Sequence, residues 1–166
     1  MTEGTYRYAM DDRHFFLKLS GHLKYRGSAD FDQFLETFSD YLKNRDVLID
    51  LTGAEYLDST NLGLLARIAD RMLTEQGKKT TIISTNEEIT KLLINIGFDE
   101  FFIIINHPEE FQTDLQKIPE LQDKERSMAA MMLDAHRALM KISEKNRETF
   151  RDVVTLLEKE VEGEKK

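Results

Sequence analysis

Residues 47–69 decide the fold, and they read VLIDLTGAEYLDSTNLGLLARIA. The first five residues predict a buried strand. From Leu62 onward, apolar residues return every three or four positions, which is the spacing of a helix. We therefore expect the hydroxyl pair Ser59 and Thr60 at the point where a loop enters that helix. The first turn of a helix has free backbone N–H groups and the positive end of the helix dipole, so it can hold a phosphate.

The same residues have a simpler interpretation. Asp, Ser and Thr are the preferred residues at the start of a helix, because their side chains accept hydrogen bonds from its first N–H groups. The tripeptide from Asp58 to Thr60, taken alone, favours such a structural cap over a phosphate site.

The context of the tripeptide adds a resemblance. Together with the strand before it and the helix after it, the loop resembles the STAS domain of bacterial anti-sigma factor antagonists, whose loop pattern is Asp-Ser-Ser/Thr-Gly-Leu-Gly. The resemblance implies that Ser59 is a phosphoacceptor. Asn61 stands where the family usually has Gly, so we expect an additional side chain beside Ser59 that hinders a docking kinase. The residues implied in partner binding are Asp58, Ser59, Thr60, Asn61, Leu62 and Gly63.

The resemblance extends over about residues 5–118. The run Ser20-Gly21-His22-Leu23 is similar to the family's turn from its second strand toward the first helix. Downstream, a strand that ends near Asn86 is followed by a helix and by Gly97-Phe98-Asp99, which is similar to the family's return to the sheet. The order of these three motifs supports the family assignment.

Hydrophobic periodicity predicts the rest of the domain independently. Strands that alternate with helices indicate an α/β fold, in which a mainly parallel or mixed sheet is packed by helices, as in a STAS domain, and followed by a C-terminal helical extension. Residues 1–118 form the STAS-like domain in this division, and residues 119–166 form the extension. The expected elements are a hairpin of strands 5–9 and 14–20, a helix around 31–42, strand 46–51, a helix from Ser59 to a stop at Gly77, strand 80–84, a helix from Asn86, strand 101–105 and a helix from Pro108.

The extension carries an amphipathic stripe from Met128 to Val161. Its spacing predicts one long helix, or two helices broken near residues 143–146. An apolar stripe must be buried, so the extension packs on its own domain, pairs with a second copy to give a homo-oligomer, or binds a partner. Met-rich turns suit an irregular groove, which favours packing on the domain. Asn146 lies in the stripe, where it fixes the register of a coiled coil or marks a helix junction.

The composition of the chain argues against several classes of function. The 166 residues carry a net charge of −8, which argues against direct binding of nucleic acid. The sequence has no cysteine and no apolar run long enough for membrane insertion, and its first six residues lack a secretory profile, so we expect a cytoplasmic protein. The four histidines are scattered, which predicts solvated or locally hydrogen-bonded rings and no metal site. No catalytic or cofactor motif is recognisable, so we expect neither an enzyme nor a cofactor.

The resemblance favours a protein-binding regulator that switches partners. Unphosphorylated Ser59 would allow the domain to sequester an anti-sigma factor or a related serine kinase, and a serine phosphatase would reset the phosphorylated form. A nonphosphorylated STAS scaffold, as a subunit of a transporter ATPase or of a stress-sensing complex, is the alternative. Nucleotide or small-ligand binding has only the fold in its favour.

Overall fold

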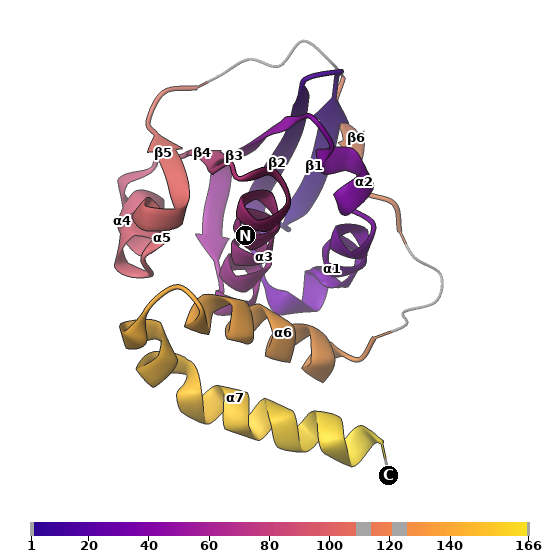
Figure 1. Ribbon diagram of the computed structural model, residues 1–166, viewed down its shortest axis with the longest axis vertical. Helices are drawn as coiled ribbons and strands as arrows, with labels where there is room; N and C mark the ends of the chain where they lie inside the picture. Colours follow the sequence, from indigo (N-terminus) through magenta and orange to yellow (C-terminus); the bar gives the residue numbers. More distant parts are fainter. Residues whose placement is uncertain (1, 109–113, 121–125, 166) are drawn as a thin grey trace.

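The computed structural model describes residues 2–108, 114–120 and 126–165 (Figure 1). One sheet is covered by helices, and two further helices follow at the C-terminus. The strands are β1 (Thr5–Met10), β2 (His14–Leu23), β3 (Asp46–Leu57), β4 (Thr80–Ile83), β5 (Phe102–Ile105) and β6 (Gln116–Lys117). The helices are the 3-10 turn η1 (Tyr25–Gly27), α1 (Ala29–Glu36), α2 (Ser39–Leu42), α3 (Ser59–Gln76), α4 (Glu87–Asn95), α5 (Phe98–Phe101), α6 (Met128–Met140) and α7 (Glu144–Glu164).

The sheet has the strand order β5-β4-β3-β2-β1-β6. Strands β2 to β5 run parallel to one another, whereas β1 is antiparallel to both β2 and β6. The turn between β1 and β2 is closed by Asp11, whose Oδ1 accepts hydrogen bonds from the backbone N–H groups of Arg13 at 2.8 Å and His14 at 2.7 Å. The predicted fold class, a mixed sheet packed by helices with a helical extension, is confirmed.

Several boundaries differ from those expected. Strand β3 continues to Leu57, because its outer half pairs with the end of β2 despite the polar residues between Thr52 and Tyr56. The single helix expected over 31–42 is two, since the backbone departs from α-helical geometry after Glu36. Strand β6 was not predicted, because two residues carry no periodicity. The helix expected from Pro108 falls largely on residues 109–113, outside the described residues.

The main core lies between the sheet and its helices. In β2 the alternate residues Phe15, Leu17 and Leu19 face this core, while Phe16 joins a smaller apolar cluster on the opposite side of the sheet. Helix α3 ends at Gly77, which adopts the left-handed conformation (φ 66°) and donates its N–H to the carbonyl of Leu73 at 3.1 Å. The helical stop expected at Gly77 is confirmed.

The C-terminal extension is a pair of helices. Ser143 begins α7 by accepting a hydrogen bond from the N–H of Asn146 at 3.1 Å. The buried amide of Asn146 donates to the carbonyls of Leu139 and Ile96, both at 2.9 Å. Asn146 therefore holds the junction between the helices and attaches it to the turn after α4. Of the two roles considered for Asn146, the structure shows the helix junction.

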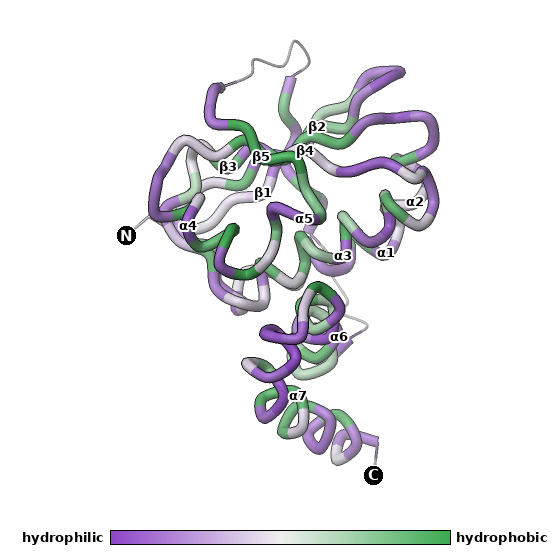
Figure 2. Tube along the Cα trace, turned by 60° about the vertical axis from the view of Figure 1, so that its left-hand side comes forward, coloured by the Kyte–Doolittle hydropathy of each residue, from purple (hydrophilic) through white to green (hydrophobic). Residues whose placement is uncertain are grey.

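Helix α6 lies between α3 and α7 (Figures 1 and 2). Its residues Ala135 and Leu139 are fully buried in the main core of the domain. Its other side packs against α7 through a separate cluster of Ala129, Leu133, Val154 and Leu157. Of the three possibilities for the extension, the structure shows packing on its own domain.

We expect Leu139→Ala to destabilise the protein by about 2–5 kcal/mol, because it leaves a cavity between α6 and the domain. Leu156→Ala is the matched control, since Leu156 is 61% exposed on α7 and its loss should change stability by less than about 0.5 kcal/mol. Chemical denaturation of both variants measures the difference. Equal stabilities would contradict the packing of α6 into the core.

Candidate functional site

Asp58 forms the cap that begins α3. Its backbone N–H donates to the carbonyl of Leu23, the last residue of β2, at 3.1 Å. One carboxylate oxygen accepts from the N–H of Tyr25 at 2.6 Å, and the other accepts from the N–H of Asn61 at 2.9 Å. Asp58 thus joins the carboxyl ends of β2 and β3 to the first turn of α3. The structural cap that the tripeptide suggested is confirmed, with Asp58 as the capping residue.

Ser59 is the first residue of α3, and its side chain is half-buried. Its Oγ lies 2.8 Å from Nε2 of His136 in α6. The other ring nitrogen of His136, Nδ1, is 2.6 Å from the carbonyl oxygen of Met132. A carbonyl only accepts, so Nδ1 carries a proton, and in the neutral ring Nε2 is left to accept the hydroxyl proton of Ser59.

His136 was expected to be solvated or locally hydrogen-bonded. The local bond to Met132 is present, but the ring is 3% exposed and packs edge-on against Phe150 of α7 at 5.5 Å. The contact with Ser59 was not anticipated, because the two residues are 77 positions apart and no periodicity connects them.

Asn61 was expected to place a side chain beside Ser59 that hinders a docking kinase, but the structure places this side chain in the interior of the domain. The residue is 0% exposed. Its Nδ2 donates to Oγ of Ser28 and to Oδ1 of Asp58, both at 2.9 Å, and its Oδ1 accepts from the hydroxyl of Tyr6. The side chain lies inside the domain because the polar groups that satisfy it come from β1, from the residue before α1 and from the cap of α3. Asn61 is therefore a structural residue rather than an obstacle at the phosphoacceptor.

Tyr6 belongs to the same buried network. Burial, and to a smaller extent the negative charge of Asp58, raise the pKa of the Tyr6 hydroxyl far above its usual range. Its hydrogen bonds with Ser28 and Asn61 act in the opposite direction and do not offset this effect. The hydroxyl is thus a permanent donor at neutral pH.

Gly63 marks the closest approach of α3 and α6. A Cβ at this position would lie 2.1 Å from the carbonyl oxygen of Ala135, so only glycine allows the two helices to be this close. Thr60 and Leu62 are buried as well. Of the six loop residues that the resemblance implies in partner binding, only Asp58 and Ser59 retain partial exposure in this conformation.

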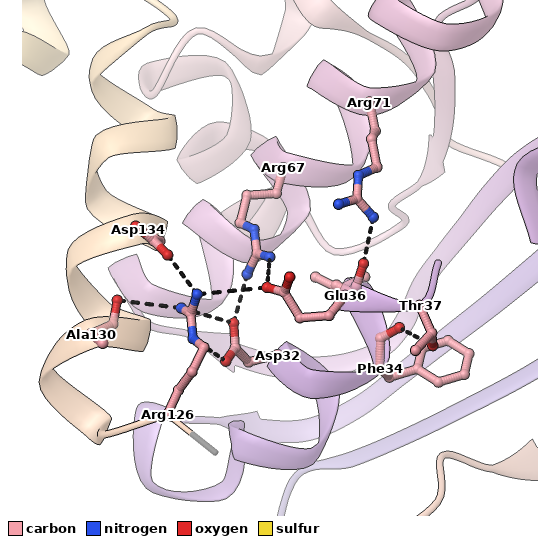
Figure 3. A network of polar contacts seen from close by, with 10 residues as sticks. Asp32, Phe34, Glu36, Thr37, Arg67, Arg71, Arg126, Ala130 and Asp134 are labelled. Carbon is pink, nitrogen blue, oxygen red and sulfur yellow. Dashed lines mark hydrogen bonds and ion pairs between the residues drawn. The ribbon is translucent and has the colours of Figure 1, made fainter. Parts of the chain in front are cut away.

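A second polar cluster attaches the start of α6 to the domain (Figure 3). Buried Asp32 of α1 accepts from Arg67 of α3 at 2.6 Å and pairs with Nε of Arg126 at 3.3 Å. Arg126 also donates to Asp134 of α6 at 2.6 Å, and Arg67 reaches Glu36 at 2.7 Å. Each charge has an opposite partner, which is the condition under which a buried carboxylate is tolerated.

The described residues contain no group of His, Asp or Glu side chains that could hold a metal ion. Across the same part of the chain, none of the helices combines the length and the apolar character that crossing a bilayer requires.

Comparison with known families assigns the domain. The family model described as STAS domain matches residues 7–111, which is more than half of the chain. The chain therefore belongs to the STAS-domain family, whose members are generally regulatory rather than enzymatic. A search among curated proteins finds no significant match. Helices α6 and α7 lie beyond the matched region.

We expect Asn61→Gly to destabilise the protein by about 2–4 kcal/mol. The variant loses hydrogen bonds worth about 1 kcal/mol each and adds the cost of a helical glycine, about 0.3 kcal/mol relative to asparagine. Asn95→Gly, at the exposed end of α4, makes the same chemical change without a buried network and should cost less than about 1 kcal/mol. Urea unfolding measures both values. A urea midpoint for Asn61→Gly equal to that of wild type would refute the structural role of the Asn61 side chain.

We also expect Tyr6 to make stability depend on pH above about 10. In the unfolded chain the hydroxyl ionises near pH 10, whereas in the folded protein its pKa is higher. Its contribution is complete below the unfolded pKa and is lost as pH rises toward the folded pKa, by about 1.4 kcal/mol per pH unit. Tyr6→Phe cannot ionise, so the stability difference between wild type and Tyr6→Phe should change by about 1 kcal/mol between pH 10 and 11 and approach the full rate above pH 11. A stability difference between the two proteins that does not change with pH would contradict the raised pKa of Tyr6.

Proposed function

We propose that the protein is a phosphorylation-switched regulator that binds an anti-sigma factor or a related serine kinase while Ser59 is unmodified. The observation that carries the proposal is the position of Ser59, which begins α3 directly after the Asp58 cap within a STAS domain. Sequestering the anti-sigma factor releases its sigma factor for transcription in the bacterial cytoplasm. The chain acts by binding, and no catalytic step is assigned to it.

Phosphorylation of Ser59 adds about −1.5 to −2 charges to a neutral hydroxyl. The N-terminal turn of α3 stabilises this charge through its dipole, so the sheet need not unfold. The partner surface, in contrast, meets a bulky dianion in place of a hydroxyl, and desolvation and repulsion weaken binding. Removal of the phosphate by a serine phosphatase restores the first state.

A constitutive STAS scaffold is the second candidate, as a subunit of a transporter ATPase or of a stress-sensing complex. It is favoured by the burial of Thr60, Asn61 and Leu62 and by the contact of Ser59 with His136, since both restrict a kinase in this conformation. A scaffold of this kind binds its partner without modification of Ser59.

We expect protein purified from its native cells to carry one phosphate on Ser59 in part of the population, as measured by intact mass and peptide mapping. In pull-downs from the same cells, Ser59→Ala should retain the partner and Ser59→Glu should recover at least tenfold less. Thr85→Glu adds the same charge at an exposed position before α4 and is the matched control.

Equal recovery by all three variants, together with an unmodified Ser59, would reject the switch and support the scaffold. Recovery of a transporter ATPase in place of a kinase-like regulator would support the same alternative.

A further inference from the structure

Helix α6 occupies the surface that the phosphoacceptor presents. His136 contacts the Ser59 hydroxyl at 2.8 Å, and its neighbour Ala135 contacts Gly63, one helical turn further along α3. The phosphoacceptor therefore lies one helical turn from the point where the two helices are closest together.

With the Ser59 side chain in its observed orientation, this packing leaves no room for a phosphoryl group. Oγ of Ser59 and Nε2 of His136 are at hydrogen-bond distance, so phosphorus and three oxygens cannot be placed between them while α6 stays in position. A local shift of the His136 ring is opposed by its bond to Met132 and by Phe150 behind it. The negative charge of Asp58 on the preceding residue adds repulsion to the steric conflict.

The contacts of α6 also indicate which kind of helix can pack on this face of α3. The residue of the bound helix that lies opposite Gly63 is small: it is Ala135, whose backbone carbonyl contacts Gly63. The next residue, His136, offers a hydrogen-bonding group to Ser59, and Leu139 one turn later is buried in the core. An amphipathic helix with a small residue, a polar group and an aliphatic residue at these positions fits this surface.

We propose that the Ser59 face of α3 is a helix-binding surface, that α6 is its internal occupant, and that an external helix of the same character replaces α6. A phosphoryl group on Ser59 excludes α6 and the external helix alike. The external partner rests on the proposed function, whereas the exclusion of α6 concerns this chain alone.

The internal occupant is held by contacts outside the crossing point. Arg126 pairs with Asp32 before α6 begins, and Asn146 donates to the carbonyl of Ile96 after it ends. Being part of the same chain, α6 also has a high effective concentration at the surface. An external helix must therefore have an affinity for this surface that is high enough to displace α6, or it must bind a chain from which α6 has been released.

Hydrogen exchange on the full chain tests the exclusion directly. Phosphoserine is introduced at position 59 by nonsense suppression, and Thr85→Glu is the control for added charge. We expect the backbone N–H groups of residues 131–140 to exchange at least tenfold faster in the phosphorylated chain, while β2 and β3 keep their protection. Unchanged protection of α6 in the phosphorylated chain would overturn the proposal.

A labelled peptide of residues 126–166 tests the surface. Wild type, with α6 in place, should bind the peptide weakly. Ala135→Glu displaces the chain's own α6 but leaves Gly63 intact, so it should bind the peptide at least tenfold more tightly. Adding Gly63→Ala or phosphoserine at 59 should abolish this gain.

A folded Ala135→Glu chain with a released α6 that does not bind the peptide would reject the helix-binding surface. If Ala135→Glu does not fold, the hydrogen-exchange experiment on the phosphorylated chain serves as the test of the proposal. Both experiments use purified chain, so their failure is separable from failure of the proposed function, which depends on phosphate and partners in the native cells.

Discussion

The carboxylate of Asp58 connects the segment after β2, the end of β3 and the first turn of α3. It accepts from the N–H of Tyr25 after β2 and from the N–H of Asn61 in α3, while its own backbone continues from β3. Parallel strands place their carboxyl ends at one edge of the sheet, and a helix start there has free N–H groups to satisfy. The position of Ser59 follows from this cap, because Ser59 is the next residue in the chain.

Behind the cap, a polar network replaces apolar packing. Tyr6, Ser28 and Asn61 are joined by hydrogen bonds in the interior, and the ring of Tyr6 stacks on Phe31 at 4.7 Å. Buried polar groups are tolerated when each has a partner, and such networks hold one arrangement more strictly than apolar contacts do. The network therefore gives the first turn of α3 a fixed geometry, and Asn61 serves this purpose where the family usually has glycine.

The extension changes what the domain presents to its surroundings. A STAS domain alone would expose the side of α3 that carries Ser59 and Gly63. In this chain α6 covers that side, with ion pairs at its start and the Asn146 amide after its end. A covalently attached helix competes at high effective concentration. In the proposed helix-binding surface, access to Ser59 is an equilibrium between docked and released α6.

The sequence by itself determined the order of strands β1 to β5 with helices α1, α3 and α4 between them, the hairpin, the cap and Ser59 at the start of α3. These features depend on neighbouring residues, whose periodicity and capping preferences are local. The sequence left open whether the extension is one helix or two, but residues 143–146 marked where a break would fall. Only the tertiary structure decided that Asn61 is buried and that His136 meets Ser59. These contacts join residues 33 and more positions apart, and long-range packing, which sets them, leaves no periodic mark in the sequence.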